Sequence, residues 1–474
     1  MTILHYILIA LEVVLIFNLI IGVHELGHFL AARWRGLKVD RFAIWFGKPI
    51  WKKKINGVEY ALGTIPFGGY VSLPQMATME AIEGKGESDG APLPNVSPLD
   101  KIIVAFAGPL FSFLLAVVFA VIVWQVGKPS NEGDSTTQIG WVQPGTPAYD
   151  SGLRAGDTIL EVDDHPVKNF MPTGPLSESI KWRIITSTGP TVKIKYQRGD
   201  KVDYAYPVPT NLPTKWYERR SLRQIFVAPA DVAQIGAIAS NSPAELAGLQ
   251  LGDVVTALDS NKIYSANAVV AAQDAMSNDV VRPLVLTIKR GDRVFDATIT
   301  PVKPLSPTNA PPLLGIMGWQ GDTNMFMVHP PPVEQLRDSA MQIFNTLGAL
   351  FAHNSQVGVQ QLGGAVMILR VYSNLFDDES GWRRVLWFSV ILNINLALLN
   401  MLPLPVLDGG HITLSLIEAV RRRPISAKVL EKIQSGFAAL LIGFMIYIAF
   451  FDAGDWIRSS RGGHEVPVVF APQK

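Results

Sequence analysis

Long apolar runs lie toward the two ends of this chain, and a mostly polar stretch separates them. Four of these runs are long enough to cross a bilayer, because about 20 apolar residues span the hydrocarbon layer. They are Ile3–Val23, Ile102–Val126, Val385–Leu402 and Ile433–Phe451. Any one run could be a buried core helix. Together they predict a polytopic α-helical membrane protein with four transmembrane helices.

Composition and charge agree with a membrane protein that has soluble parts. Charged residues make up 17% of the 474 positions, against about 25% in soluble globular proteins. The 41 basic and 40 acidic residues nearly cancel, so there is no global field that would attract nucleic acid. The chain has no cysteine, which excludes a disulfide scaffold, an iron–sulfur site and thiol catalysis.

Basic residues orient the predicted helices. Two loops are rich in Lys and Arg, one after the first apolar run and one between the third and fourth runs. The positive-inside rule places both loops in the cytoplasm. The two termini and the long middle region are then predicted to lie outside. The basic residues are Arg33, Arg35, Lys38, Arg41, Lys48, Lys52, Lys53 and Lys54 in the first loop, and Arg421, Arg422, Arg423, Lys428 and Lys432 in the second.

The middle region contains a tandem repeat. Four short motifs recur at a constant offset of 96 residues, which indicates a duplication. The matched motifs are Ile139-Gly140 with Ile235-Gly236, Thr146-Pro147-Ala148 with Ser242-Pro243-Ala244, Gly152-Leu153 with Gly248-Leu249, and Gly156-Asp157 with Gly252-Asp253. A fifth match, between Arg-Gly-Asp at 198–200 and at 290–292, has an offset of 92.

Each repeat is predicted to be a set of short strands around a helix. Residues 158–162 and 254–258 are predicted to be strands. The Gly-Asp pairs within 198–200 and 290–292 are typical of hairpin turns. The shared pattern resembles that of PDZ domains, which bind an extended peptide by adding it to a sheet edge. The alternative is a pair of β-rich spacers without a peptide ligand.

Residues His24-Glu25-Leu26-Gly27-His28 form an H-E-x-x-H motif. On a helix, positions i and i+4 lie on the same face, so two imidazoles there can share one metal ion. Glu25 would lie close by as a general base. Zinc is the metal expected for two histidines joined by a carboxylate. Ionisable residues within a membrane span are costly and are therefore functional by default.

A catalytic zinc site requires a third protein ligand. Asp408 follows the third apolar run at the membrane face where His24 and His28 are also expected. Prolines and glycines around it would unwind the backbone, which is tolerated at membrane depth where it lines a cavity. Asp408 could instead be a helix cap or turn residue. The other candidate ligands, in decreasing order, are His411, and then Glu12 and Glu418.

These motifs together resemble the site-2 proteases, zinc metalloproteases that cut peptide bonds inside the membrane, and in particular the bacterial regulator-of-sigma-E protease subgroup. The resemblance covers nearly the whole chain. It rests on H-E-L-G-H, Gly-Pro at 108–109, N-x-x-P-x-P-x-L-D-G-G-H at 400–411 and the two PDZ-like units. Two stretches depart from the family pattern: Ser112 stands where Gly-Pro-x-x-Asn has asparagine, and residues 361–364 lack a Gly-Pro.

The resemblance implies a role for each site residue. His24, His28 and Asp408 would bind zinc, and Glu25 would activate water. Asn400 would steady the substrate backbone or the developing oxyanion. A membrane-associated β region after the first span would hold an unwound substrate at its edge, through Gly68, Gly69 and Tyr70.

The sequence therefore predicts an intramembrane zinc endopeptidase in the bacterial inner membrane. Its expected substrates are single-span proteins, such as a pre-cut anti-sigma factor, and remnant signal peptides. The active site would lie near the cytoplasmic face and the PDZ units outside. The alternatives are a catalytically inactive PDZ scaffold and a zinc transporter.

Six segments are predicted. They are 1–126 with the first two transmembrane helices and the β loop, 127–218 and 219–305 as PDZ-like domains, 306–384 as a linker with an amphipathic membrane-surface helix, 385–456 with the last two transmembrane helices, and 457–474 as a loose polar tail.

Overall fold

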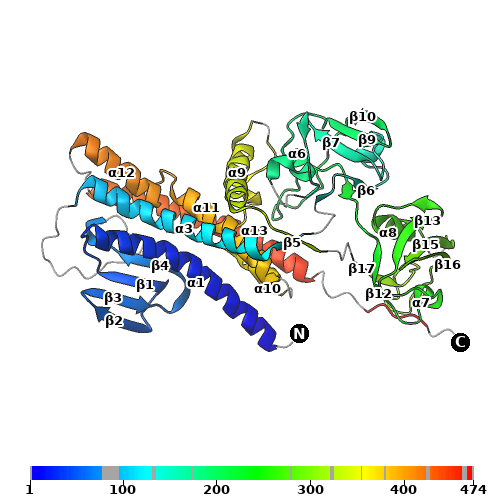
Figure 1. Cartoon of the computed structure of the whole chain (residues 1–474), viewed down its shortest axis with the longest axis horizontal. Helices are drawn as coiled ribbons and strands as arrows, with labels where there is room; N and C mark the ends of the chain where they lie inside the picture. The colour runs from blue at the N-terminus through cyan, green and yellow to red at the C-terminus, as the bar shows by residue number, and fades with distance from the viewer. Residues whose placement is uncertain are drawn as a thin grey trace. The chain divides into compact units, whose positions relative to one another are not determined.

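A computed structural model describes residues 3–76, 96–130, 135–171, 175–277, 280–320, 325–353, 355–377, 381–422, 427–461 and 467–471. The chain divides into two compact units (Figure 1). The first comprises Met1–Pro129, Val328–Ile343 and Leu362–Ala453, and the second comprises Ser130–Met327, Phe344–Gln361 and Gly454–Lys474.

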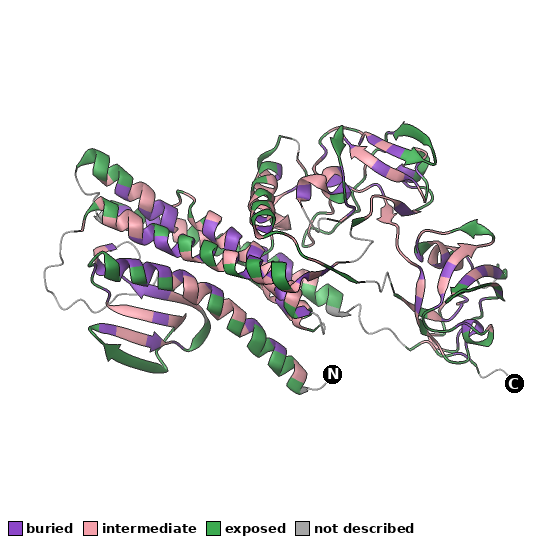
Figure 2. Cartoon of the chain, viewed as in Figure 1, coloured by how far each residue is buried: buried purple, intermediate pink, exposed green. Residues whose placement is uncertain are grey.

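Four described helices are long and apolar enough to cross a membrane. They are α1 (Ile3–Trp34), α3 (Pro98–Val126), α11 (Gly381–Asn400) and α13 (Ala427–Arg461). Three of them contain a whole predicted apolar run, whereas the third predicted run, Val385–Leu402, extends two residues past the end of α11. Figure 2 shows a long exposed face on the first half of α1, and that face carries large apolar residues such as Leu4, Leu11 and Leu15. An exposed apolar face of this length is what a lipid-contacting helix presents.

The first compact unit contains α1, α3, α11 and most of α13, and we call it the membrane unit. Helix α3 is its central element. Its start is fixed by Ser97, whose hydroxyl accepts the backbone N–H of Asp100 at 3.2 Å. Its end is fixed by Gly127, which adopts a φ of 72° that favours glycine. Between these ends α3 packs against α1, α11 and α12 (Asp408–Arg421). Its side chains Ala116, Phe119 and Ala120 are buried in one apolar cluster.

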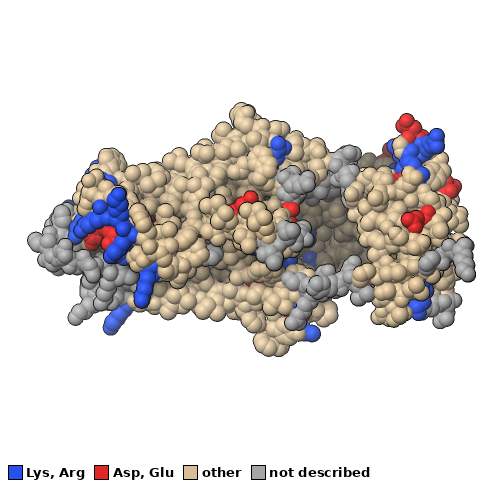
Figure 3. Space-filling view, turned by 90° about the horizontal axis from the view of Figure 1, so that it is seen from below, with Lys and Arg blue, Asp and Glu red and all other residues tan. Residues whose placement is uncertain are grey.

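A small four-stranded sheet follows α1. Its strands are β1 (Arg41–Phe46), β2 (Trp51–Ile55), β3 (Val58–Leu62) and β4 (Ile65–Ser72), in the order β2-β3-β1-β4. Strand β1 runs parallel to β3 and antiparallel to β4. Strand β2 is fully exposed and carries three consecutive lysines, Lys52–Lys54, and Figure 3 shows basic side chains gathered at this end of the molecule. Strand β4 forms the other edge and packs against α1.

Two shorter helices complete the connections, and neither was predicted from the sequence. Helix α10 (Ala365–Phe376) precedes α11, and α12 follows it. The carboxylate of Asp452 in α13 accepts the backbone N–H groups of Gly364 and Met367 at 3.0 and 3.1 Å. Residues 361–364, which lack the family's Gly-Pro, therefore lead into a helix whose N-terminus is held by α13.

The predicted amphipathic helix is α9 (Pro332–Phe351). Leu336 and Ala340 of its apolar stripe pack against the cluster on α3 and α11. The Gln335 side chain also donates to the carbonyl of Ala120 at 3.0 Å. Phe351, at the end of the stripe, is 81% exposed.

The two repeats contain the same eight elements in the same order. The first has β6 (Ile139–Val142), α5 (Pro147–Asp150), β7 (Thr158–Val162), β8 (His165–Pro166), α6 (Ile180–Thr186), β9 (Ile194–Arg198), β10 (Lys201–Ala205) and β11 (Val227–Pro229). The second has β12 (Gln234–Ile238), α7 (Pro243–Leu246), β13 (Val254–Leu258), β14 (Asn261–Lys262), α8 (Asn267–Asp274), β15 (Leu284–Arg290), β16 (Arg293–Ile299) and β17 (Ile316–Gln320). Each repeat encloses its own apolar core. Strands β7 and β13 match the predicted bounds.

Strand pairing continues past both boundaries that the sequence suggested for the repeats. Strand β11 pairs with β6 and carries the first repeat beyond residue 218. Strand β17 pairs with β12 and carries the second beyond residue 305. In both cases the last strand returns to the first one after a long connection, which local turn signals cannot reveal. The predicted loose tail is also partly wrong, because α13 extends to Arg461 and residues 467–471 pack on the second repeat.

The duplicated Asp and Arg positions form the same buried ion pair in both repeats. The carboxylate of Asp157 accepts from Arg198 at 2.6 and 2.7 Å, and that of Asp253 accepts from Arg290 at the same two distances. Both aspartates are 1% exposed or less. Burial alone would raise the pKa of Asp253, but Arg290 and the backbone N–H of Gln250 hold that pKa below its usual value. These bidentate pairs hold the start of β7 against the hairpin of β9 and β10, and the start of β13 against the hairpin of β15 and β16.

We predict that Asp253→Asn destabilises the second repeat by about 2 kcal/mol, because it removes one partner of a largely buried pair. A lowered pKa in the folded state means that the carboxylate stabilises the repeat above its unfolded pKa of about 4 and loses this effect as the pH falls further. Urea-dependent hydrogen exchange of residues 231–320 should show this pH dependence in the wild type and a weaker one in the variant. Asp292→Asn, at an exposed hairpin position, should leave both unchanged.

Candidate metal centre

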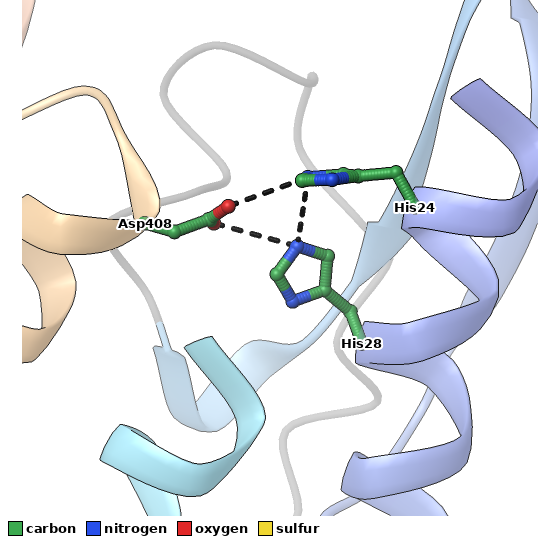
Figure 4. A group of neighbouring side chains, drawn as sticks. All are labelled: His24, His28 and Asp408. Atoms are coloured by element: carbon green, nitrogen blue, oxygen red, sulfur yellow. Dashed lines mark hydrogen bonds and ion pairs between the residues drawn. The ribbon is translucent and has the colours of Figure 1, made fainter. Parts of the chain in front are cut away.

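Three side chains from two helices converge in the membrane unit (Figure 4). His24 and His28 come from α1, and Asp408 is the first residue of α12. The Nε2 atom of His24 lies 3.3 Å from Asp408 Oδ2, and that of His28 lies 3.4 Å from Oδ1. The two Nε2 atoms are 3.3 Å apart. All three residues are at least nine-tenths buried.

The helical spacing predicted from the motif places both histidines on one face of α1. Asp408 reaches them because α11 ends at Asn400 and the chain turns back before α12 begins. Two glycines allow this turn to be tight. A Cβ atom on Gly409 would lie 2.3 Å from the carbonyl oxygen of Met401, and one on Gly410 would lie 2.0 Å from that of Leu404. In the Asp-Gly-Gly sequence, the two glycines thus permit the close backbone packing that brings the Asp408 carboxylate to the histidines.

Helix α3 supplies a second layer of contacts that orients both histidines. His24 Nδ1 lies 2.9 Å from the hydroxyl of Ser112, and His28 Nδ1 lies 2.8 Å from the carbonyl oxygen of Val104. An Nδ1–H that donates to Val104 leaves the Nε2 lone pair of His28, on the side of Asp408, available to bind a metal ion. Gly108 makes room for this ring, because a Cβ atom there would lie 2.1 Å from His28 Nε2.

The two imidazole nitrogens and the carboxylate are close enough together to bind one zinc ion. At Zn–N and Zn–O distances of about 2.0–2.1 Å, the edge between two ligands of a tetrahedron is about 3.3–3.4 Å. The two Nε2 atoms are separated by 3.3 Å, which matches this edge, and each lies 3.3–3.4 Å from a different oxygen of the Asp408 carboxylate. His24, His28 and Asp408 form the group of potential metal ligands found among the described residues, with all ligand atoms within 4.8 Å of one another. His411 is buried nearby but is not a member of this group.

A cavity of about 210 Å³ opens beside the three ligands. Glu25 and Asn400 line it together with Ile21, Leu396, Val406 and Leu407. The Oε2 atom of Glu25 is buried and has no hydrogen-bond partner. The position next to the histidines is the one expected for a general base that receives a proton only when water and substrate are bound.

Three residues of the β region were expected to contact substrate, and the structure places them in different surroundings. Gly69 lies directly against Glu25, because a Cβ atom there would be 3.4 Å from Glu25 Cγ. Gly68 has a φ of 78° and packs under the ring of Phe46. Tyr70 is buried within the small sheet, and its hydroxyl accepts from Arg41 at 3.1 Å. Of the three, Gly69 is therefore the one placed beside the site.

Comparison with known proteins gives the same picture over nearly the whole chain. The model of peptidase family M50 matches residues 12–444, which include every element of the site. The chain belongs to peptidase family M50.

Among its M50 relatives, the regulator of sigma E protease of Haemophilus influenzae is 27% identical over 91% of this chain and 96% of its own length. The metalloprotease MmpA of Caulobacter vibrioides is 25% identical over 94% of this chain and 96% of its own length. M50 peptidases are zinc-dependent, and this chain is a zinc metalloendopeptidase of the site-2 type. That assignment confirms the predicted family, enzyme class and cofactor.

Ser112 contacts a candidate ligand, although the sequence indicated only its departure from the family pattern. Its place one turn after the Gly-Pro of α3 was visible, but its partner 88 positions away was not. The geometry makes it a positioning residue for His24.

We predict that Ser112→Ala lowers zinc affinity about 10- to 100-fold, as loss of an outer-layer partner of a metal-bound histidine typically does. Chelator competition on the purified protein measures the affinity, and the visible spectrum of the cobalt-substituted protein reports ligand geometry. Phe113→Ala, at an exposed neighbour on the same helix, should change neither. Unchanged zinc affinity in Ser112→Ala would show that the Ser112–His24 contact does not orient the ligand.

Proposed function

We propose that this M50 peptidase cuts single-span membrane proteins within or near the bilayer. The observation that carries the proposal is the place of the ligand cluster. His24, His28 and Asp408 are buried against α1, α3 and α12, and α1 and α3 are long and apolar enough to span a membrane. A hydrolytic site built among such helices is accessible to a peptide that is itself in the membrane.

The ligand set fits zinc, with His24 and His28 donating through Nε2 and Asp408 through its carboxylate. When bound, zinc polarises the scissile carbonyl and lowers the pKa of water toward about 7. Glu25 accepts the proton of the attacking water and passes it to the leaving amide nitrogen. Its buried Oε2 atom has no hydrogen-bond partner among the described residues, and Glu25 lines the cavity beside the ligands, so this oxygen is available to accept the proton. Asn400, on the cavity wall, provides an amide that can hold the substrate carbonyl or the developing oxyanion.

Strand β4 offers a way to hold the substrate. A helical substrate hides its peptide groups in internal hydrogen bonds, so it must unwind before attack. Strand β4 is an edge strand, and its residue Gly69 lies against Glu25. An unwound segment that pairs with this edge is presented to the base and the metal ligands as an added strand. Binding through backbone hydrogen bonds tolerates many substrate sequences.

The two repeats fit PDZ modules, with strands enclosing one longer helix in each. The basic loops near Lys52–Lys54 and Arg421 favour a cytoplasmic position for the sheet and for the α12 end of the bundle. The helices then span the inner membrane of a bacterial cell, and the repeats lie outside the cytoplasm. The relative named regulator of sigma E protease supports a role in regulated proteolysis of a pre-cut membrane protein. Remnant signal peptides are chemically equivalent substrates.

Two other functions use the same features less completely. An inactive PDZ scaffold would not need a buried, unpartnered Glu25 beside a full ligand set. A zinc transporter would need polar ligands along a path, whereas the ligand group found in the described residues is a single cluster. The complete catalytic set therefore favours the peptidase.

We predict that Glu25→Gln retains zinc but loses cleavage by about 10²- to 10⁴-fold, the usual contribution of a general base. His24→Ala should lose both metal and cleavage. The assay uses purified protein in liposomes, a tagged single-span substrate with a truncated outer domain, and metal analysis of the same samples. Glu12→Gln, on an exposed face of α1, is the matched control and should keep both. Full activity of Glu25→Gln would eliminate the proposed base, and cleavage outside the substrate's span would argue against intramembrane proteolysis.

A further inference from the structure

The C-terminal residues Pro467–Ala471 are ordered against the second repeat. Val469 forms an antiparallel bridge with Ser306 in the segment that follows β16. The carbonyl of Val469 accepts the N–H of Leu305 at 2.7 Å, and its N–H donates to the carbonyl of Ser306 at 3.0 Å. This is the hydrogen bonding of an added strand, although the two segments are separated by more than 160 positions in the sequence.

Phe470 anchors the tail. It is 3% exposed, whereas its neighbour Val469 is 47% exposed. Its ring lies beside Gly315, at the start of β17, with Cε2 3.3 Å from the point where a Cβ of residue 315 would be. Gly315 has a φ of 87°, and the same Cβ position would lie only 2.1 Å from the Cβ atom of Ser242, the residue before α7. The ring is thus buried at the junction of β17 and α7.

The first repeat differs from the second at the corresponding place. The residue immediately before its last strand is Phe226, which also has a positive φ, of 64°. In the second repeat this position is Gly315, and the aromatic ring next to it comes from the tail.

We propose that the second repeat has a peptide-binding site formed by the edge at Leu305–Ser306 and the seat of Phe470, and that the chain's own C-terminal tail is its resident ligand. The ligand class is an extended apolar peptide with a β-branched residue followed by an aromatic one. One bridge and one buried ring give a modest intrinsic affinity. Covalent attachment raises the effective concentration of the tail to about the millimolar range, which keeps the site occupied.

The opposite end of the same segment is also held. In the last turns of α13, Asp455 and Arg458 form ion pairs with the connection that leads to β11. Asp455 lies 2.6 Å from Arg219, and Arg458 lies 3.4 Å from Glu218. The described residues on either side of 462–466 therefore contact both repeats, Asp455 and Arg458 the first and Val469 and Phe470 the second. An occupied tail site restrains the second repeat, and an emptied one exposes an apolar seat to other peptides. This consequence is independent of the catalytic residues.

The test compares the full chain with a chain ending at Glu465, both purified in detergent. The probe is a fluorescent peptide with the sequence of residues 466–474, and binding is measured by anisotropy. We expect the shortened chain to bind the peptide at least about tenfold more tightly than the full chain, whose site is occupied. The same peptide carrying Phe470→Ala should lose about tenfold or more in affinity. Equal binding by the two chains, or no binding by the shortened one, would overturn the proposal.

A crosslink tests the docked position in the intact protein. The chain has no cysteine, so Ser306→Cys combined with Val469→Cys reports without background. Directly opposed residues of an antiparallel pair have Cα atoms about 5.5 Å apart, which suits a disulfide. We expect this pair to crosslink in membranes and the pair Thr300→Cys with Val469→Cys not to. No crosslink in the first pair contradicts docking, and a crosslink without peptide binding to the shortened chain would make the tail a fixed part of the repeat and not a ligand.

Discussion

Three ionisable side chains are buried together in the membrane unit, and the packing of the helices around them depends on this constraint. His24, His28 and Asp408 would each be costly to bury alone. They are acceptable together because their ligand atoms face one another at the edge length of a metal coordination shell. That arrangement requires α3 close to α1, and the two helices meet through glycine: a Cβ on Gly27 would lie 2.4 Å from the carbonyl oxygen of Ala107. The close packing, the outer contacts from Ser112 and the turn before α12 all serve the orientation of one ligand cluster.

The sequence revealed what is local and left open what is tertiary. Spacing alone placed His24 and His28 on one helical face, and the apolar runs gave the four long helices. Asp408 could be predicted as the third ligand because the third apolar run was expected to end at the same membrane face as the two histidines, although it is far from them in sequence. The contact between Ser112 and His24 was not predictable, since no local pattern states which residue of α3 faces which residue of α1. Helices α10 and α12 were missed because each is short and bounded by segments with strong turn or span signals.

The repeats show the same limit from another side. A constant offset identified the duplication and the matched Asp and Arg positions, but the pairing of Asp157 with Arg198 and of Asp253 with Arg290 appears only in the folded structure. Boundaries failed for a topological reason. In both repeats the last strand joins the first one, so the end of the repeat lies far beyond its last local turn. The polar tail was predicted to be loose because its composition is that of a linker, and one buried phenylalanine is too small a signal to outweigh composition.

The geometry of the site bears on how such an enzyme can be selective. The cavity beside the ligands is small, at about 210 Å³, and Glu25 and Asn400 are its polar walls apart from the metal ligands. In the proposed mechanism the substrate is held through backbone hydrogen bonds at β4, which do not discriminate among side chains. Under that mechanism, the site would hydrolyse any unwound segment that reaches it. Selectivity must then come from what is admitted, and the second unit, with its two repeats and a tail that occupies one of them, is the part of the chain whose contacts can change without disturbing the ligand cluster.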